Sequence, residues 1–250
     1  MATWEPVMPI PLSGIGKHTL KFWKPLRFRE LKMGFESPVG CQAGRGGWLE
    51  YTPQNLDQFR CYFQPYLPPN VMAADLTVSS TDFTHLHPDY HLLPPRDLWP
   101  NLVPTLALLR YLMAVSGVSF QIHSVYRSSF VNSHSGGAAA SAHMDCSGID
   151  ITPNTQPQKA IWLAKHIWYQ KGASIKMGLG FYTSTRFHID ARAPHHPQKR
   201  RWGWGQSASV CQHHYNQHFS ATLPDDIWPF NDNAALVPTP DESCGYSPSC

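Results

Sequence analysis

Residues 141–150 read SAHMDCSGID, and residues 187–190 read FHID. Between them these two segments supply two imidazoles, His143 and His188, and one nearby carboxylate, Asp150. Zinc in catalytic sites typically takes three protein ligands drawn from His and Asp or Glu, and leaves the fourth position to water or substrate. The sequence therefore predicts one Zn²⁺ ion bound by His143, Asp150 and His188.

Both segments carry strand signatures that favour this arrangement. Alternate residues of a strand project from the same face, so His188 and Asp190 should point the same way, as Asp150 does from its own strand. If the two strands are neighbours, Asp150 and His188 meet on one face of the sheet. His143 would then approach the same point from the loop that precedes Asp150.

The segments that flank 141–150 and 187–190 predict a small α+β domain. Proline near the start and glycine at the end delimit one strongly apolar helix, and a second helix is stopped by Gly172. The predicted elements in chain order are a helix at 104–117, a strand at 119–127, a strand at 148–151, a helix at 155–171, and strands at 177–182 and 187–191. This order predicts a small antiparallel sheet packed by helices.

Long irregular flanks surround these elements. A short helix is predicted from Pro53, since proline suits a first helical position. Residues 65–104 carry eight prolines, which indicates a long loop across the surface, and residues 128–141 are expected to form a small, flexible loop. We expect a single domain over 1–250, with its recognisable core at 105–205 and family-specific flanks at 1–104 and 206–250.

The composition of the chain argues against nucleic-acid binding and against a transmembrane segment. The 250 residues are 42% hydrophobic and 15% charged, with a formal net charge of +3, which is typical of a globular chain. Outside Lys199, Arg200 and Arg201 there is no basic stripe, so nucleic-acid binding is not predicted. The sequence has no run of about eighteen apolar residues, so a transmembrane helix is not predicted. The first residues lack a signal-peptide pattern. We expect a monomer.

The cysteine pattern leaves two interpretations open. The six cysteines are an even number, which fits disulfides in an oxidising compartment, but their spacing matches no zinc motif. Buried or unpaired thiols are the alternative.

Four motifs occur in one order along this part of the chain. They are SVYRS at 124–128, SAH at 141–143, GLGFY at 178–182 and FHIDAR at 187–192. In these four motifs and in their order, the chain resembles the zinc D-Ala-D-Ala carboxypeptidase and murein endopeptidase family, which is related to the hedgehog signalling domain. The resemblance covers about residues 105–205.

The resemblance implies zinc-dependent hydrolysis of amide bonds in peptidoglycan stem peptides or cross-links, in the periplasm or the extracellular cell envelope. It implies His143, Asp150 and His188 as zinc ligands, and Arg127 as a catalytic and substrate-binding residue. Tyr126 and Ser141 are the other predicted substrate contacts. An alternative is a non-catalytic zinc domain that binds cell-wall peptide or a protein partner.

The chain departs from the pattern of the family at three positions. Val125 and Cys146 stand where many relatives have glycine, and Cys146 could be a packed small residue, an oxidisable thiol or a competing ligand. Thr185 stands where many members carry the Asp or Glu that serves as general base. Asp190 is then the predicted catalytic carboxylate, either as the base or as a partner that orients a ligand imidazole. Asp145 is a more distant candidate.

Overall fold

The computed structural model describes residues 49, 52–78, 93–192, 198–203 and 223–230. The helices are α1 (Pro53–Phe63), η3 (Gln64–Tyr66), η4 (Ala73–Thr77), η7 (Arg96–Leu102), α2 (Val103–Ser116), α3 (Ser129–His134) and α4 (Pro157–Gln170). The strands are β1 (Phe120–Ser124), β2 (Gly148–Pro153), β3 (Met177–Phe181), β4 (Phe187–Ala191) and β5 (Arg200–Trp202). The predicted α+β class is confirmed.

The five strands form one sheet in the order β1-β2-β4-β3-β5. The first four strands pair antiparallel, as predicted, but β5 pairs parallel with β3, so the sheet is mixed. No strand was predicted at 200–202, and this added strand makes the sheet mixed. β5 lies on the far side of β3 from β4 and runs the same way as β3.

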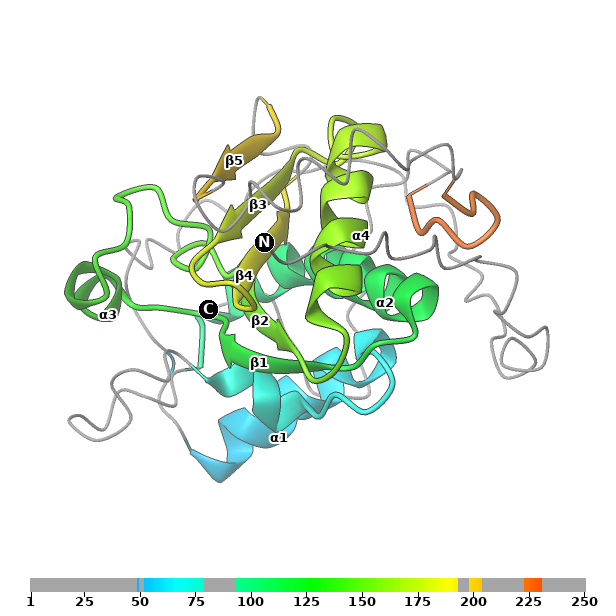
Figure 1. Ribbon diagram of the computed structural model, residues 1–250. Coiled ribbons are helices and arrows are strands. Elements are labelled where there is room, and N and C mark those ends of the chain that lie inside the picture. Colours follow the sequence, from blue (N-terminus) through cyan, green and yellow to red (C-terminus); the bar gives the residue numbers. More distant parts are fainter. Residues whose placement is uncertain (1–48, 50–51, 79–92, 193–197, 204–222, 231–250) are drawn as a thin grey trace, which may run out of the picture.

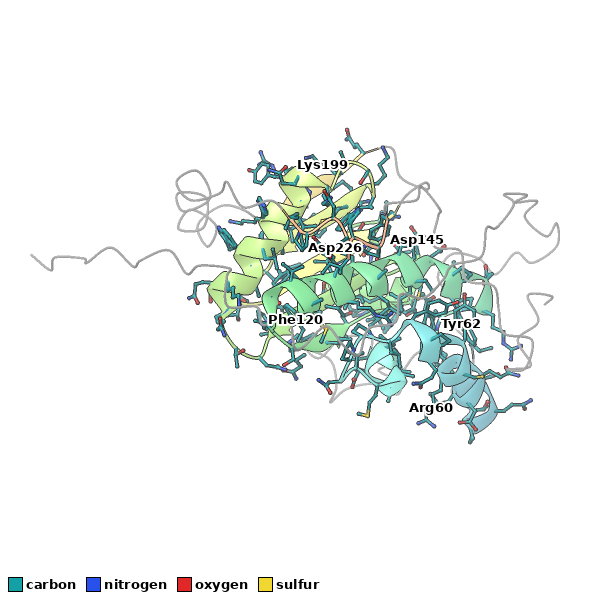
Figure 2. The ribbon with its side chains drawn as sticks, turned by 90° about the vertical axis from the view of Figure 1, so that its right-hand side faces the viewer. Arg60, Tyr62, Phe120, Asp145, Lys199 and Asp226 are labelled. Atoms are coloured by element: carbon teal, nitrogen blue, oxygen red, sulfur yellow. The ribbon has the colours of Figure 1, made fainter. Side chains whose placement is uncertain are left out.

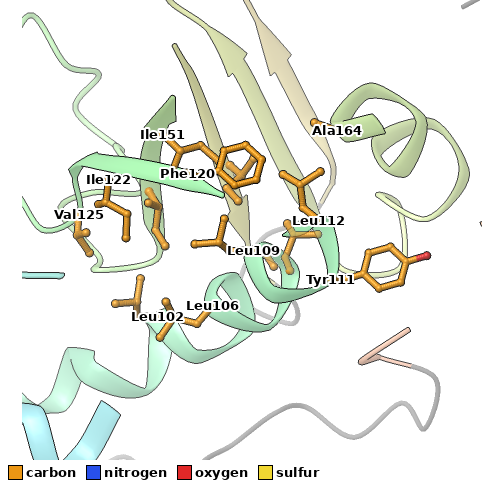
Figure 3. Packing of buried hydrophobic residues seen from close by; sticks show 14 of the residues in the cluster. Leu102, Leu106, Leu109, Tyr111, Leu112, Phe120, Ile122, Val125, Ile151 and Ala164 are labelled. Atoms are coloured by element: carbon orange, nitrogen blue, oxygen red, sulfur yellow. The ribbon is translucent and has the colours of Figure 1, made fainter. Parts of the chain in front are cut away.

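One face of the sheet is apolar. In register, Ile151 lies opposite Phe187 and Phe187 opposite Phe181, while Ile149, Ile189 and Leu179 form the next row. All six side chains are buried. Figure 1 shows α2 and α4 together on one side of the sheet, and Figure 3 shows Phe120 and Ile151 facing Leu109 and Leu112 of α2. The hydrophobic effect therefore fixes this face toward the helices.

The same alternation gives the other face to polar and small residues. Asp150 of β2 lies opposite His188 of β4, and His188 lies opposite Gly180 of β3. Because the side-chain period of a strand is two, burying the isoleucines on the helix side turns these residues to the opposite side. The polar face therefore carries the predicted ligands.

Helix α2 lies at the centre of the core, and its ends follow the prediction. Pro104 occupies its first turn, and Gly117 caps it at φ +66° while donating from its backbone N–H to the carbonyl of Met113 at 2.8 Å. Together with η7 it forms Arg96–Ser116, which by length and composition is the one candidate for a membrane span among the described residues. Over half of that apolar window is buried inside the structure, as expected of a core helix.

The N-terminal flank is partly a core element. The predicted helix from Pro53 is confirmed as α1, with the Thr52 hydroxyl accepting a hydrogen bond from the N–H of Asn55 at 3.2 Å. Figure 2 shows Tyr62 turned toward α2 and Arg60 pointing away from the molecule. The surface loop predicted at 65–104 is wrong for its described parts. Four of their side chains are fully buried, namely Leu76, Leu93, Trp99 and Leu102. Proline prevents long regular elements there, but it does not prevent burial.

Two further segments differ from the sequence prediction. The 128–141 loop contains α3, whose start is capped by the Ser128 hydroxyl, which accepts from the N–H of Val131 at 3.3 Å. Residues 223–230 pack on α2, where the Tyr111 hydroxyl donates to the carbonyl of Pro224 at 3.1 Å. One hydrophobic cluster therefore joins residues from α1 to this C-terminal segment.

The structure describes two of the six cysteines, and each takes one of the two predicted forms, a disulfide or a free thiol. Cys61 is disulfide-bonded, whereas Cys146 is a free, buried thiol. The other four cysteines lie outside the described residues.

Candidate metal centre

The structure brings the three predicted ligands together in a buried group. His143 lies in the turn between α3 and β2, while Asp150 and His188 are paired across β2 and β4. His143 Nε2 lies 3.0 Å from Asp150 Oδ1 and 3.1 Å from His188 Nδ1, and the third side of this triangle is 2.9 Å. Three donor atoms at such separations surround a space suited to one metal ion.

Hydrogen bonds at the other ring nitrogen orient the His143 side chain. Its Nδ1 lies 2.6 Å from the carbonyl oxygen of Val125, which assigns the proton to Nδ1 and leaves Nε2 as the lone-pair donor. The N–H of Val125 donates in turn to the carbonyl of Val78 at 2.8 Å. The end of β1 and the chain after η4 therefore set the orientation of the first ligand.

His188 is oriented from the opposite side of its ring. Its Nδ1 faces Asp150 and His143, while its Nε2 lies 3.0 Å from Asp190 Oδ2. A Cβ atom at Gly148 would lie 2.5 Å from His188 Cε1, so the ring occupies space that only glycine leaves open. A carboxylate partner of this kind raises the basicity of a ligand imidazole and fixes its tautomer.

The position of Asp190 bears on its two predicted roles. Its Oδ1 forms an ion pair with Arg200, and its Oδ2 faces His188 Nε2, so both oxygens are engaged. The carboxylate lies across the imidazole ring from the three ligand atoms. This geometry favours the role of a partner that orients His188.

Arg127 lies against the ligand Asp150. Its Nε donates to the Ser124 hydroxyl at 2.8 Å, and its Nη2 forms an ion pair with Asp150 Oδ2. Its backbone N–H donates to the carbonyl of His143 at 3.1 Å. The residue is 7% exposed, so its guanidinium first serves to hold the ligand carboxylate.

Of the other two predicted substrate contacts, one is buried in the core and one lies in the turn that carries His143. Tyr126 is buried in the core, and its burial, together with the nearby Cys146, raises its pKa. A buried phenol offers substrate no surface in this structure. Ser141 is half-buried, and its hydroxyl accepts a hydrogen bond from the N–H of His143 at 3.3 Å, within the turn that carries this ligand.

Tyr182 lies at the site although no role was assigned to it from the sequence. Tyr182 comes two residues after Gly180 and four after Gly178, so its side chain lies on the same polar face as those glycines. The residue is 47% exposed. Burial of its hydroxyl, a charge interaction with Asp150 and a hydrogen bond to that carboxylate raise its pKa. The strand period of two was the sequence signal that could have placed it there.

Burial and charge set the protonation states of the ligands. Burial, strengthened by the nearby Arg127 guanidinium, lowers the pKa of His143 to about 4, although Asp150 acts against this shift. Burial alone would raise the pKa of Asp150, but His143 and His188 hold it well below its usual range. Burial also acts to lower the pKa of His188, and its bonds to Asp150 and Asp190 outweigh that effect and raise it. Asp150 is therefore ionised and His143 neutral at pH 7, as metal binding requires.

Cys146 is a packed residue in this structure. It is fully buried in the hydrophobic core and does not belong to the described His-Asp-His group. Its φ of +53° lies in the left-handed region, which explains why glycine suits this position. Asp145 beside it forms an ion pair with Arg192, and its carbonyl accepts from the Asn101 side chain at 2.9 Å.

Thr105 is a structural partner of the site that no sequence pattern indicated. Its hydroxyl donates to the carbonyl of Ser147 at 2.6 Å and accepts from the N–H of Ala191 at 2.9 Å. The first turn of α2 thereby connects the start of β2 to the end of β4, the two strands that carry Asp150 and His188.

A buried set of two imidazoles and one carboxylate is typical of proteins that use a catalytic metal ion. Residues 95–190 match the family model described as Peptidase M15, so this part of the chain is similar to the metallopeptidases of that family. The match extends from η7 to β4 and ends before β5. No curated protein and no solved structure gave a match.

Proposed function

We propose that the protein is a zinc-dependent peptidase that hydrolyses amide bonds in the stem peptides or cross-links of peptidoglycan. The observation that carries the proposal is the buried group of His143, Asp150 and His188, whose ligand atoms all lie within 4.8 Å of one another. It lies within the segment that matches a metallopeptidase family.

The donor set fits zinc. Two imidazole nitrogens, of which that of His188 would release its proton on metal binding, and one carboxylate oxygen are borderline and hard donors that suit Zn²⁺. Both imidazoles are held by hydrogen bonds at their outer nitrogens. When bound there, Zn²⁺ would supply Lewis acidity that polarises the scissile carbonyl and lowers the pKa of a water molecule.

The side chains of this protein would prepare the site for that chemistry. Arg127 neutralises part of the charge of Asp150 and holds one of its oxygens, which leaves the other oxygen directed at His143 and His188. Tyr182, half-exposed beside Asp150, is placed where a substrate would meet the site. Its hydroxyl bonds to Asp150 in this structure, and with a substrate carbonyl in place of that acceptor it would donate a hydrogen bond to the substrate.

The location that we propose is the periplasm or the extracellular cell envelope, where peptidoglycan lies. The disulfide at Cys61 supports this, because disulfides persist in oxidising compartments.

A non-catalytic zinc domain that binds cell-wall peptide is the second candidate. The observations that favour it are Thr185 in the position of the usual general base and the engagement of both oxygens of Asp190. On this alternative the protein would bind stem peptide without cleaving it.

Purified protein would separate the two candidates. We expect close to one zinc per chain by elemental analysis, and release of peptide fragments from purified murein that stops after chelation and resumes with Zn²⁺. A His188→Ala variant should lose both metal and activity. Full activity of the metal-free protein would contradict the peptidase proposal, and stoichiometric zinc with peptide binding but no cleavage would favour the second candidate.

A further inference from the structure

Strand β5 reaches the metal centre although it lies beyond the family match. It pairs parallel with β3, with Gly178 in register with Arg200 and Gly180 with Trp202. Gly178 is also in register with Asp190, and Gly180 with His188. Residues in register across a sheet share a face, so Arg200 and Trp202 lie on the same face as the ligand His188 and its partner Asp190.

The two glycines of β3 leave the space that these side chains use. A Cβ atom at Gly178 would lie 2.1 Å from Asp190 Oδ2 and 2.9 Å from Arg200 Nη2. A Cβ atom at Gly180 would lie 2.0 Å from Trp202 Cε2. The side chains of Arg200 and Trp202 therefore pass over the two glycines of β3 and contact residues of β4.

The contacts form a chain that ends at the ligand triangle. Arg200 forms an ion pair with Asp190, whose other oxygen lies 3.0 Å from His188 Nε2. The Trp202 ring packs on the His188 ring, with 5.0 Å between centroids and 51° between planes. Both the tilt and the rotation of the His188 imidazole are thereby restrained from β5.

Helix α4 holds β5 in place. The Trp168 indole Nε1 donates to the carbonyl of Arg200 at 2.8 Å, and the Lys199 ammonium lies 4.0 Å from the centroid of the Trp168 ring. These contacts fix the backbone of an edge strand of only three residues. The backbone of Arg200 is therefore held from α4, while its side chain reaches Asp190.

We propose that Arg200 and Trp202 are positioning residues for the metal ligand His188: Arg200 fixes Asp190 against the imidazole Nε2, and Trp202 packs on the ring. The proposal rests on the proposed zinc site and deepens it, because it makes β5 part of the metal centre. Neither residue is assigned a contact with substrate.

The adjacent Arg201 provides a matched control. It lies on the same strand and carries the same charge, but it is exposed and points to the other face, where its guanidinium lies 5.7 Å from the centroid of the Trp168 ring and not near Asp190. We compare Arg200→Met with Arg201→Met by competition of each purified full-length protein for Zn²⁺ against a chromophoric chelator. Loss of a partner behind a metal ligand typically weakens metal binding by about 10–100-fold. Arg200 acts through Asp190, so we expect about tenfold weaker binding in Arg200→Met and less than twofold change in Arg201→Met.

Two further measurements separate positioning from general stability. The visible spectrum of the Co²⁺-loaded protein reports ligand geometry, and we expect it to change in Arg200→Met and Trp202→Leu but not in Arg201→Met. Arg200→Lys keeps the charge but not the planar fork of donors, so it should restore part of the affinity. Thermal unfolding of the metal-free proteins identifies any variant that fails to fold.

Gly178→Ala gives an independent perturbation from β3, because its new methyl group would displace the Asp190 carboxylate. The methyl group would also press on the Arg200 guanidinium, so the variant should weaken Zn²⁺ binding through the same ion pair without any substitution in β5. Equal Zn²⁺ affinity and equal Co²⁺ spectra in Arg200→Met and Arg201→Met would overturn the positioning proposal, and the peptidase proposal would stand. A wild-type protein that binds no zinc would overturn both.

Discussion

At the scale of single residues, the site depends on which nitrogen of each histidine faces inward. His143 directs Nε2 to the ligand triangle and His188 directs Nδ1, because Val125 and Asp190 occupy the opposite nitrogens. The same two imidazoles therefore sit in different electrostatic surroundings. Their protonation should differ accordingly.

In the metal-free protein we expect His143 to stay neutral down to about pH 4. We expect His188 to keep its proton at pH values above the ordinary pKa of histidine. Below pH 6.5 an unfolded chain protonates His143 while the folded chain does not, so this residue makes the free energy of unfolding fall as pH drops from 6.5 toward 4. Two-dimensional ¹⁵N–¹H spectra of the imidazoles, recorded across this range, check the assignment. Protonation of His143 near pH 6.5 would contradict it.

Cys146 offers a second prediction at this scale. Its φ of +53° costs a non-glycine residue about 1 kcal/mol, while its buried side chain contributes packing. Cys146→Ala loses the sulfur and keeps the unfavourable φ, so we expect it to be less stable by about 1–2 kcal/mol. Cys146→Gly should be no less stable than Cys146→Ala in spite of its larger cavity. Urea unfolding of both variants measures the difference, and a clearly less stable Cys146→Gly would show that φ is not the limiting factor.

At the scale of elements, the metal centre depends on how α2, β2 and β4 are joined. The apolar face of β2 and β4 packs on α2, which leaves their polar face for the ligands. Thr105 adds a polar connection, since its hydroxyl bonds to both Ser147 and Ala191. The buried donor and acceptor would lose their partner if the hydroxyl were removed.

Thr105→Val keeps the shape of the side chain and removes the hydroxyl. We expect a loss of about 1–3 kcal/mol in the free energy of unfolding, because a buried carbonyl and a buried N–H are left unsatisfied. Thr105→Ser retains the hydroxyl and serves as the control, with a smaller loss. Chemical denaturation measures both, and equal losses in the two variants would assign the effect to the methyl group instead.

At the scale of the whole molecule, segments far apart in the chain complete one core. Trp228 packs edge-on against Tyr111 of α2, with 4.8 Å between ring centroids, and lies beneath the Lys171 ammonium. The Tyr111 hydroxyl also bonds to Pro224. The segment 223–230 therefore covers a side of α2 that would otherwise face water.

Trp228→Ala should destabilise the protein by about 3–5 kcal/mol, since it removes a large buried ring. Met72→Ala is a suitable comparison, because Met72 is mostly exposed and should change stability by less than about 0.5 kcal/mol. Thermal and urea unfolding of both variants give the values. A loss below 1 kcal/mol for Trp228→Ala would show that the C-terminal segment is not part of the cooperative unit.

Local patterns of the sequence were sufficient for much of the fold. Proline at the start and glycine at the end of α2, and the alternation along β2 and β4, are encoded by neighbouring residues, and these elements occur as predicted. The prolines of the N-terminal flank led to the wrong prediction of a surface loop. Burial there depends on contacts with α2 that no local pattern encodes.

For the site, the sequence by itself determined the candidate donor set, because the order and spacing of His143, Asp150 and His188 on two strand segments already favoured one metal ion. Only the tertiary structure decided which imidazole nitrogens face inward, that Asp190 lies behind His188, and that β5 supplies Arg200 and Trp202. The physical reason is that a strand fixes which face a side chain takes within a few residues. Its partner on that face is chosen by strand pairing between distant segments and by glycines that leave room for the contact.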